Sequence, residues 1–257
     1  MTRFVAIGSA KGGVGKTVAA INLGTAFANF GKDVVVLDAS ISKPNISIHL
    51  GTPKLEYTIH DVLAGKTHIT DAAYIHHSGL RIIPGNISLQ RLKDVGDLKH
   101  FKSLLLDLVG TTDLVLLDTG SGLGSEVVNV ISAADEMIAI TNPDVPSVTD
   151  TLKTIRAAED AGIKVIGVIV NRYGSNGVDM GIKNIEAMLE KNIIGIIPED
   201  ASVAKSIVAR QPMVYLYPDS PASLGFKRIA ANLMGQDFAH SLSAEKKDFL
   251  DRAYEKI

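Results

Sequence analysis

The chain carries the run Lys11-Gly12-Gly13-Val14-Gly15-Lys16-Thr17 between an apolar segment and a segment with helical periodicity. The apolar segment, residues 4–8, has the length and composition of a buried β-strand. The periodic segment, residues 17–29, has the spacing of an α-helix. A strand, a glycine-rich loop and a helix in this order are typical of a phosphate-binding loop. Residues 11–17 are therefore predicted to bind a nucleotide.

The residue types in this loop suit Mg-ATP. Glycines let backbone N–H groups approach a phosphate chain closely, and the start of a helix adds a partial positive charge. Lys16 can reach the β and γ phosphates, and the hydroxyl of Thr17 can bind Mg²⁺. We therefore expect ATP and Mg²⁺ as cofactors, with Lys16 and Thr17 as the central phosphate and metal contacts.

Further apolar segments of strand length recur along the chain, with helical periodicity between most of them. The strand segments are residues 4–8, 33–37, 80–83, 113–117, 137–140, 164–170 and 193–197. The helical segments include residues 17–29, 147–161 and 178–190, and Gly31 and Gly162 stand where helix ends are expected. This alternation predicts an α/β fold, with a doubly wound, mostly parallel sheet and helices on both faces.

Bulk composition limits the kinds of site. The 257 residues are 46% hydrophobic and carry a net charge of -2, so no overall positive field favours binding to DNA or to anionic lipid. Cysteine is absent, which excludes disulfides, thiolate zinc sites and cysteine-held iron–sulfur clusters. The seven histidines show no metal-ligand spacing, and we expect them to be structural or on the surface.

The beginning of the chain runs directly into the first predicted strand, without the features of a signal peptide. No apolar run approaches the roughly 18 residues that a membrane-spanning helix needs. We therefore expect a cytoplasmic protein. Composition changes near Gly235, after which charged residues become frequent, and this change predicts an ATPase domain at residues 1–235 and a tail at residues 236–257.

Two details of the loop are informative. The standard motif has glycine where this chain has Ala10, and it does not require the additional Lys11. In this combination the sequence resembles the deviant Walker A P-loop ATPases of the MinD and ParA superfamily, and it is most similar to MinD-like proteins. The resemblance implies that Lys11 reaches the nucleotide of a partner subunit. It therefore implies an ATP-dependent homodimer.

The resemblance extends over nearly all of residues 1–235 and implies roles for further residues. Asp38 with Ser40 and Asn45 resembles switch I, and Asp118 resembles the Walker B acid. The implied ATP-binding residues are Lys11, Gly12, Gly13, Val14, Gly15, Lys16, Thr17, Val18, Asn171, Arg172, Pro198 and Asp200. The implied catalytic residues are Lys11, Lys16, Asp38 and Asp118, and the implied metal contacts, partly through water, are Thr17, Asp38 and Asp118.

Two positions depart from the family pattern. Ser40 stands where the family usually has a second aspartate, which helps to activate the attacking water. Gly120 stands where the Walker B segment usually has proline. Serine is a much weaker base than a carboxylate, so we expect hydrolysis to be slowed by about 10² to 10⁴-fold. Binding of ATP and dimerisation do not require the missing acid.

The tail can form a short amphipathic helix with Phe249, Leu250 and Tyr254 on one side. It resembles the terminal membrane-targeting helix of MinD. Residues 236–257 contain four basic and five acidic side chains, whereas anionic lipid favours a basic polar face. Two interpretations remain open, a weak and reversible membrane contact or a contact with protein.

Three functions are compatible with this pattern. The first is a MinD-like dimerising ATPase that positions a cell-division or polar complex together with an unidentified activating or cargo protein. The second is a ParA-type partition ATPase, which needs a basic surface, so DNA binding is not expected from the net charge. The third is a largely non-hydrolysing ATP-dependent scaffold, which measured turnover distinguishes from the first.

Overall fold

The computed structural model describes residues 1–52, 55–88, 98–174, 178–236 and 238. Within them, eight strands form one sheet with the order β3-β4-β2-β5-β1-β6-β7-β8. All neighbouring strands are parallel except β3 and β4. The predicted fold class, a doubly wound and mostly parallel α/β sheet, is confirmed.

Seven strands fall where apolar segments predicted them, whereas the short edge strand β3 was not predicted. Their bounds are β1 Arg3–Gly8, β2 Val34–Ala39, β3 Tyr74–Ile75, β4 Arg81–Ile83, β5 Leu114–Thr119, β6 Glu136–Thr141, β7 Lys164–Tyr173 and β8 Ile193–Pro198. The α-helices are α1 Lys16–Asn29, α2 Ile46–Leu50, α3 Ile59–Leu63, α5 Phe101–Leu105, α6 Ser125–Ala133, α7 Val145–Asp160, α8 Ile182–Leu189, α9 Ala201–Val208, α10 Met213–Leu216 and α11 Pro221–Leu233. Two 3₁₀ turns, η1 Leu98–His100 and η2 Leu106–Leu108, flank α5.

Two predicted helix starts were wrong by a few residues. Helix α7 begins before Ser147, because Asp144 caps it through the Ser147 N–H and Pro146 fits the first turn. Helix α8 begins only at Ile182, because Gly181 is extended and the Met180 N–H donates to the Pro143 carbonyl. The predicted helix ends at Gly31 and Gly162 are confirmed by their positive φ angles of 81° and 78°.

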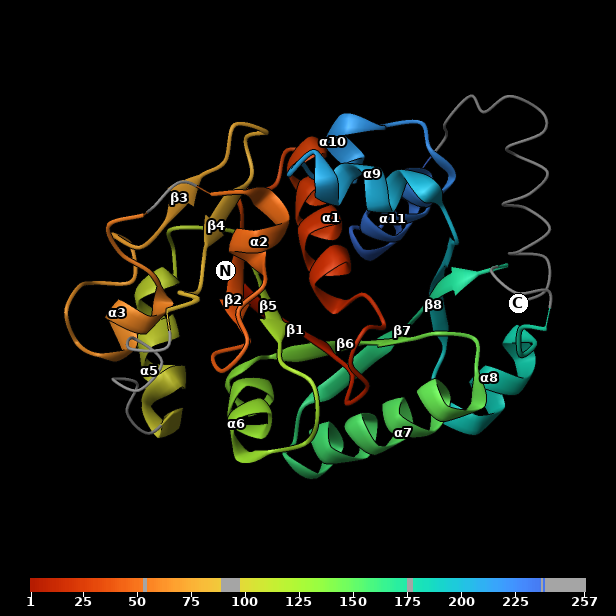
Figure 1. Ribbon diagram of the computed structural model, residues 1–257. Coiled ribbons are helices and arrows are strands. Elements are labelled where there is room, and N and C mark those ends of the chain that lie inside the picture. Colours follow the sequence, from red (N-terminus) through yellow and green to blue (C-terminus); the bar gives the residue numbers. More distant parts are fainter. Residues whose placement is uncertain (53–54, 89–97, 175–177, 237, 239–257) are drawn as a thin grey trace.

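Helices cover both faces of the sheet because side chains alternate along each strand. Phe4 and Ala6 of β1 face one buried cluster, which α3, α5, α6, α7 and α8 complete. Val5 and Ile7 face the other, which α1, α10 and α11 complete. Figure 1 shows these two layers, with α1 and α11 above the strands and α6 and α7 below them. This sandwich leaves the carboxyl ends of the central strands free to carry loops.

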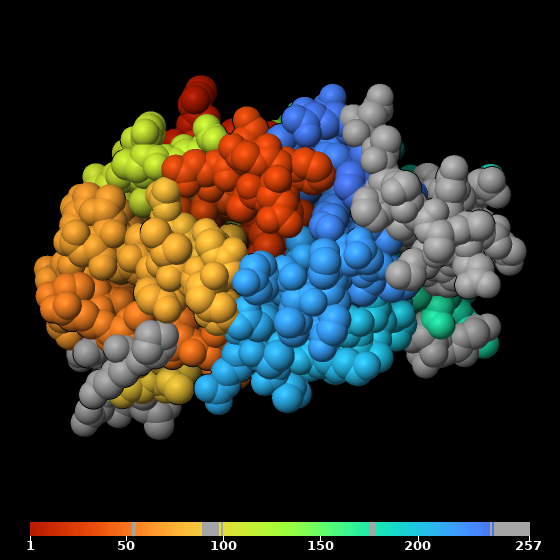
Figure 2. Space-filling model, turned by 90° about the horizontal axis from the view of Figure 1, so that it is seen from above, coloured from red at the N-terminus to blue at the C-terminus, as the bar shows by residue number. Residues whose placement is uncertain are grey.

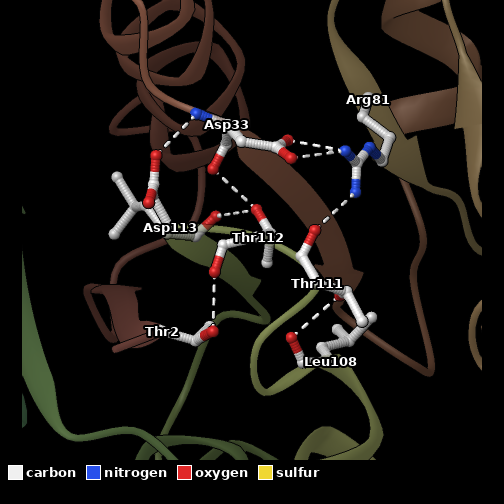
Figure 3. A network of polar contacts seen from close by, with 8 residues as sticks. Thr2, Asp33, Arg81, Leu108, Thr111, Thr112 and Asp113 are labelled. Atoms are coloured by element: carbon white, nitrogen blue, oxygen red, sulfur yellow. Dashed lines mark hydrogen bonds and ion pairs between the residues drawn. The ribbon is translucent and has the colours of Figure 1, made fainter.

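A polar clamp ties the amino ends of several strands together (Figure 3). Arg81 donates to both carboxylate oxygens of Asp33, at 2.6 and 2.8 Å. Thr112 donates its hydroxyl to the Asp33 carbonyl, and Thr2 donates its hydroxyl to the Thr112 carbonyl, both at 2.6 Å. Arg81 also reaches the Thr111 carbonyl at 3.4 Å. The clamp lies at the end of the sheet opposite the predicted phosphate loop.

The segment around α9 and α10 packs against the β3–β4 edge. Figure 2 shows this segment in light blue beside the golden segment of β3 and β4. The side chains of Gln211 and His77 meet between the two segments, which are 134 residues apart in sequence. Parts of the chain that are far apart in sequence thus meet at this edge of the sheet.

The predicted tail contacts Phe249, Leu250 and Tyr254 lie outside the described residues. Just before them, Phe238 packs edge-on against Phe30 with ring centroids 6.1 Å apart. The division at residue 235 therefore stays a prediction. Among the described residues, none of the helices has the length and apolar character to cross a membrane.

Candidate functional site

The glycine-rich loop connects β1 to α1 and borders a cavity of about 340 Å³. Gly13 and Gly15 have φ angles of 79° and 100°, in the left-handed region that favours glycine. Gly15 stands directly before Lys16, so the free N–H groups of the first turn of α1 lie at this loop. The described residues that line the cavity are Gly12, Gly13, Gly15, Lys16, Thr17, Val18, Ser40, Lys43, Asn45, His49, Thr119, Gly120, Ser121, Arg172 and Ile207.

Lys16 is almost fully buried, with 8% of its surface exposed. Its Nζ atom donates to the carbonyl of Lys11 at 3.2 Å. Burial lowers the pKa of Lys16, while the nearby carboxylate of Asp118 acts in the opposite direction. A buried ammonium beside a loop of N–H donors is suited to binding an anion such as a phosphate.

Asp118 and Thr17 form the part of the site that fits a metal ion. The Thr17 hydroxyl donates to Oδ2 of Asp118 at 2.7 Å. The other carboxylate oxygen, Oδ1, is buried and has no hydrogen-bond partner among the described residues. Burial raises the pKa of Asp118 to about 6, although the Thr17 bond and Lys16 act to lower it. A buried carboxylate oxygen without a donor matches what Mg²⁺ or its bound water requires.

Asp38 lies beside Asp118, as its register partner on β2. Its carboxylate accepts three backbone N–H groups, from Ser40 at 3.3 Å, Asn45 at 2.9 Å and Ile46 at 3.0 Å. Burial, followed by the charge of Asp118, raises the pKa of Asp38 well above its usual range. These three contacts make Asp38 the anchor of residues 40–46, and its predicted metal contact, partly through water, stays a prediction.

Residues 40–45 are the segment predicted to be switch I, and Ser40 and Asn45 both line the cavity. The Ser40 hydroxyl donates to the Lys43 carbonyl at 2.9 Å, and the Asn45 amide donates to the same carbonyl at 2.8 Å. Ser40 is only 4% exposed. The segment is therefore a closed turn, held from below by Asp38.

Lys11 is the first residue of the glycine-rich loop, but it is not among the described residues that line the cavity. Its Nζ atom lies 3.1 Å from Oδ1 of Asp144, the residue that caps α7. Partial burial acts to raise the pKa of Asp144, but hydrogen bonds from Ser147 and Lys11 leave it below its usual value. In the single chain, Lys11 is thus paired with a carboxylate of its own subunit.

The remaining predicted ATP-binding residues gather at a second, smaller pocket of about 170 Å³ next to Gly15 and Val18. Asn171, Arg172, Pro198 and Asp200 all line it. The Asn171 amide donates to the Val14 carbonyl at 2.7 Å and so contacts the phosphate loop directly. The carboxylate of Asp200 accepts N–H groups from Ser202 and Ala222 and caps α9. The phosphate loop and these four predicted ATP-binding residues therefore border adjoining pockets, which share Gly15 and Val18.

Sequence reasoning missed several residues of this region. Lys43, His49 and Ser121 line the larger cavity. Glu126, in the first turn of α6, contacts switch I through Ser42. Glu126 could not be found from a local motif, because the residue that it contacts, Ser42, lies 84 positions away in the sequence. For Asp144 a signal existed, since an aspartate three residues before a serine at a helix start is typical of an N-cap.

Comparisons with known proteins agree with this geometry. The family model CbiA, described as the CobQ/CobB/MinD/ParA nucleotide binding domain, matches residues 5–213. An uncharacterized ATP-binding protein of Methanocaldococcus jannaschii is 38% identical over 252 residues, which cover 98% of this chain and 95% of that protein. The septum site-determining protein MinD of Pyrococcus horikoshii, solved with Mg-ADP, has a TM-score of 0.87 and 30% identity, covering 91% of this chain and 96% of its own. The MinC:MinD cell division protein complex of Aquifex aeolicus contains a chain with a TM-score of 0.82 and 30% identity, covering 93% of this chain and 98% of its own. The protein therefore belongs to the MinD/ParA superfamily of P-loop ATPases.

Proposed function

We propose that this protein binds Mg-ATP in the cavity above the glycine-rich loop and hydrolyses it to ADP and phosphate. The observation that carries this proposal is the arrangement of Lys16, Thr17 and Asp118, in which the buried ammonium of Lys16 lies near a carboxylate that is bonded to Thr17 and has one oxygen without a partner among the described residues. Lys16 would hold the phosphates, and Thr17 and Asp118 would hold Mg²⁺, with Asp38 anchoring the segment above them. The metal would offset negative charge on the phosphates when bound.

The proposed biological role is that of a MinD-like switch. Two subunits would associate with ATP between them, with Lys11 reaching the partner's nucleotide after leaving Asp144. The Pyrococcus horikoshii relative was solved with Mg-ADP, and the Aquifex aeolicus relative was solved in a complex with MinC. These relatives support a nucleotide-dependent switch that engages a second protein and positions a cell-division or polar complex.

The proposed turnover is slow, because Ser40 offers a hydroxyl where a carboxylate would be a stronger base. Steady-state ATP hydrolysis by the purified full chain tests this point. Turnover like that of MinD proteins would contradict the argument from Ser40. Complete absence of turnover, with tight ATP binding, would favour the scaffold interpretation.

Nucleotide binding is tested by titrating a fluorescent ATP analogue with and without Mg²⁺. Lys16→Ala should weaken binding by about 100-fold, since charge-assisted hydrogen bonds to phosphate are worth up to about 3 kcal/mol. Lys32→Ala, an exposed lysine beyond the far end of α1, is the matched control and should bind normally. Equal binding by all three proteins would show that the cavity is not the nucleotide site.

The proposed membrane contact is tested by sedimentation with anionic liposomes in ATP, ADP or no nucleotide. If the tail binds lipid, ATP should drive the full chain onto the liposomes, because two tails in a dimer add their weak affinities. Leu250→Glu should abolish this binding without changing ATP affinity. Absence of lipid binding in every nucleotide state would leave the tail as a contact for protein.

A further inference from the structure

Transfer of a phosphoryl group to water requires a polar group that orients the water in line with the bond that breaks. Among the described residues lining the cavity, none is a carboxylate, and Ser40, Asn45 and Ser121 are neutral. The carboxylates of Asp38 and Asp118 are fully buried below it and are bound by backbone N–H groups and by Thr17. Orientation of water thus depends on how firmly the neutral residues of switch I are held.

Glu126 holds this segment from the side. The Ser42 N–H donates to Oε1 of Glu126 at 3.0 Å. The Ser42 hydroxyl donates to Oε2 of the same carboxylate. Glu126 lies in the first turn of α6, the helix that follows β5 and Asp118. Both carboxylate oxygens are therefore used to join switch I to the element after Asp118, a two-point contact that fixes orientation as well as distance.

The contact between Glu126 and switch I lies close to the cavity, because Gly120 lines the cavity and is near both Ser40 and Glu126. A Cβ atom placed on Gly120 would lie 3.5 Å from the Ser40 hydroxyl oxygen and 3.7 Å from Oε1 of Glu126. It would also lie 3.3 Å from a methyl group of Val127. Ser40 and Glu126 thus approach one point that glycine leaves free. The two positions that depart from the family pattern, Ser40 and Gly120, meet at this point beside the carboxylate of Glu126.

We propose that Glu126 is a positioning residue for ATP hydrolysis, which acts through Ser42 to hold Ser40 and Asn45 in place at the cavity. The proposal rests on the proposed function, because it assigns Glu126 a part in the same reaction. Asp38 anchors switch I at its base, and Glu126 anchors it at the side facing α6. Glu126 does not itself line the cavity, so its effect on water passes through the backbone of residues 40–45.

Single-turnover and steady-state hydrolysis of Mg-ATP by full-length variants tests the proposal. Glu126→Ala should lower kcat by about 10- to 100-fold, the cost of small misplacement in an active site. KM and the affinity for a non-hydrolysable ATP analogue should stay within about twofold, because the phosphate loop is untouched. Glu126→Gln should recover most of the loss, because its amide can accept the Ser42 N–H and donate to the Ser42 hydroxyl.

Two further variants make the test specific. Ser42→Ala combined with Glu126→Ala should be no slower than Glu126→Ala alone, because both changes break the same contact. Glu159→Ala is the matched control, since this carboxylate forms ion pairs with Lys191 and Arg156 at the distant end of α7 and should leave kcat unchanged. Thermal unfolding of each variant verifies that the fold is kept.

The outcomes separate this inference from the proposed function. A wild-type protein that neither binds nor hydrolyses ATP would overturn both. A wild-type protein that hydrolyses ATP, with Glu126→Ala equally fast, would overturn only the role of Glu126. A parallel loss of ATP affinity and kcat would assign Glu126 a general structural role, and a Glu126→Gln variant as slow as Glu126→Ala would show that its charge acts directly. Either result would overturn the proposed positioning through Ser42.

Discussion

The ammonium of Lys11 lies 3.1 Å from Oδ1 of Asp144 within one chain. Asp144 also accepts the Ser147 N–H at 2.8 Å and the Ser147 hydroxyl at 2.6 Å, so the start of α7 holds it in place. The proposed dimer needs Lys11 to face a partner's nucleotide. The pair with Asp144 must therefore separate when two subunits associate.

Replacing Asp144 with asparagine should favour the dimer. Asparagine keeps the helix cap but removes the charge that retains Lys11. A half-exposed ion pair contributes up to about 1 kcal/mol, so the dimer association constant should rise by up to about fivefold per subunit. Sedimentation equilibrium with a non-hydrolysable ATP analogue measures it. Asp150→Asn, which breaks the exposed pair of Asp150 with Lys153 on the same helix, should change nothing.

The glycine-rich loop offers a matched pair of substitutions. A Cβ atom on Gly15 would lie 2.4 Å from Nδ2 of Asn171, whereas one on Gly13 would meet no atom within 4 Å. Both residues have positive φ, so each change to alanine costs about 1–2 kcal/mol of backbone strain. Gly15→Ala should in addition displace Asn171 from the Val14 carbonyl and weaken ATP binding more than Gly13→Ala. Equal affinities of the two variants, measured by titration, would contradict the close approach of Asn171 to Gly15.

Asp118 should give the nucleotide-free protein a distinctive pH dependence. Its pKa is about 6 in the folded chain against 3.8 ordinarily, so the folded state keeps a proton that the unfolded state releases between these values. Deprotonation of Asp118 therefore lowers the free energy of unfolding as pH rises from about 4 to about 6, by up to about 3 kcal/mol. Asp118→Asn should be more stable relative to the wild type at pH 7 than at pH 4, as measured by urea unfolding. A constant difference across this range would rule out the raised pKa.

The clamp of Arg81 and Asp33 should affect stability without affecting the nucleotide. Arg81→Ala removes the partly exposed ion pair with Asp33 and the longer bond to the Thr111 carbonyl, which are together worth about 1 kcal/mol. The melting temperature should fall by about 2–4 °C, whereas ATP affinity should be unchanged because the clamp lies at the amino ends of the strands and the phosphate loop follows the carboxyl end of β1. Arg81→Lys should recover part of the loss. A change in ATP affinity would show that the two ends of the sheet are coupled.

Local patterns were sufficient for seven strands, for the three helices named from the sequence and for the phosphate loop. Seven of the strands lie at apolar segments that alternate with helices, because strands buried on both faces need continuous apolar side chains. Lys16 and Thr17 could be named because the loop and the start of α1 are adjacent in sequence. Helix starts were less certain, and α8 begins at Ile182 rather than 178 because the extended Gly181 precedes it.

Contacts between distant residues were decided only by the packing of the sheet. The register of β2 against β5 brings Asp38 beside Asp118, and the fold of residues 40–46 brings three backbone N–H groups to Asp38, a contact that no motif indicated. The contacts of Lys11 with Asp144 and of Ser42 with Glu126 join residues 133 and 84 positions apart. Local sequence patterns carry information about neighbours along the chain, whereas these pairings depend on strand order and on where each helix lies against the sheet.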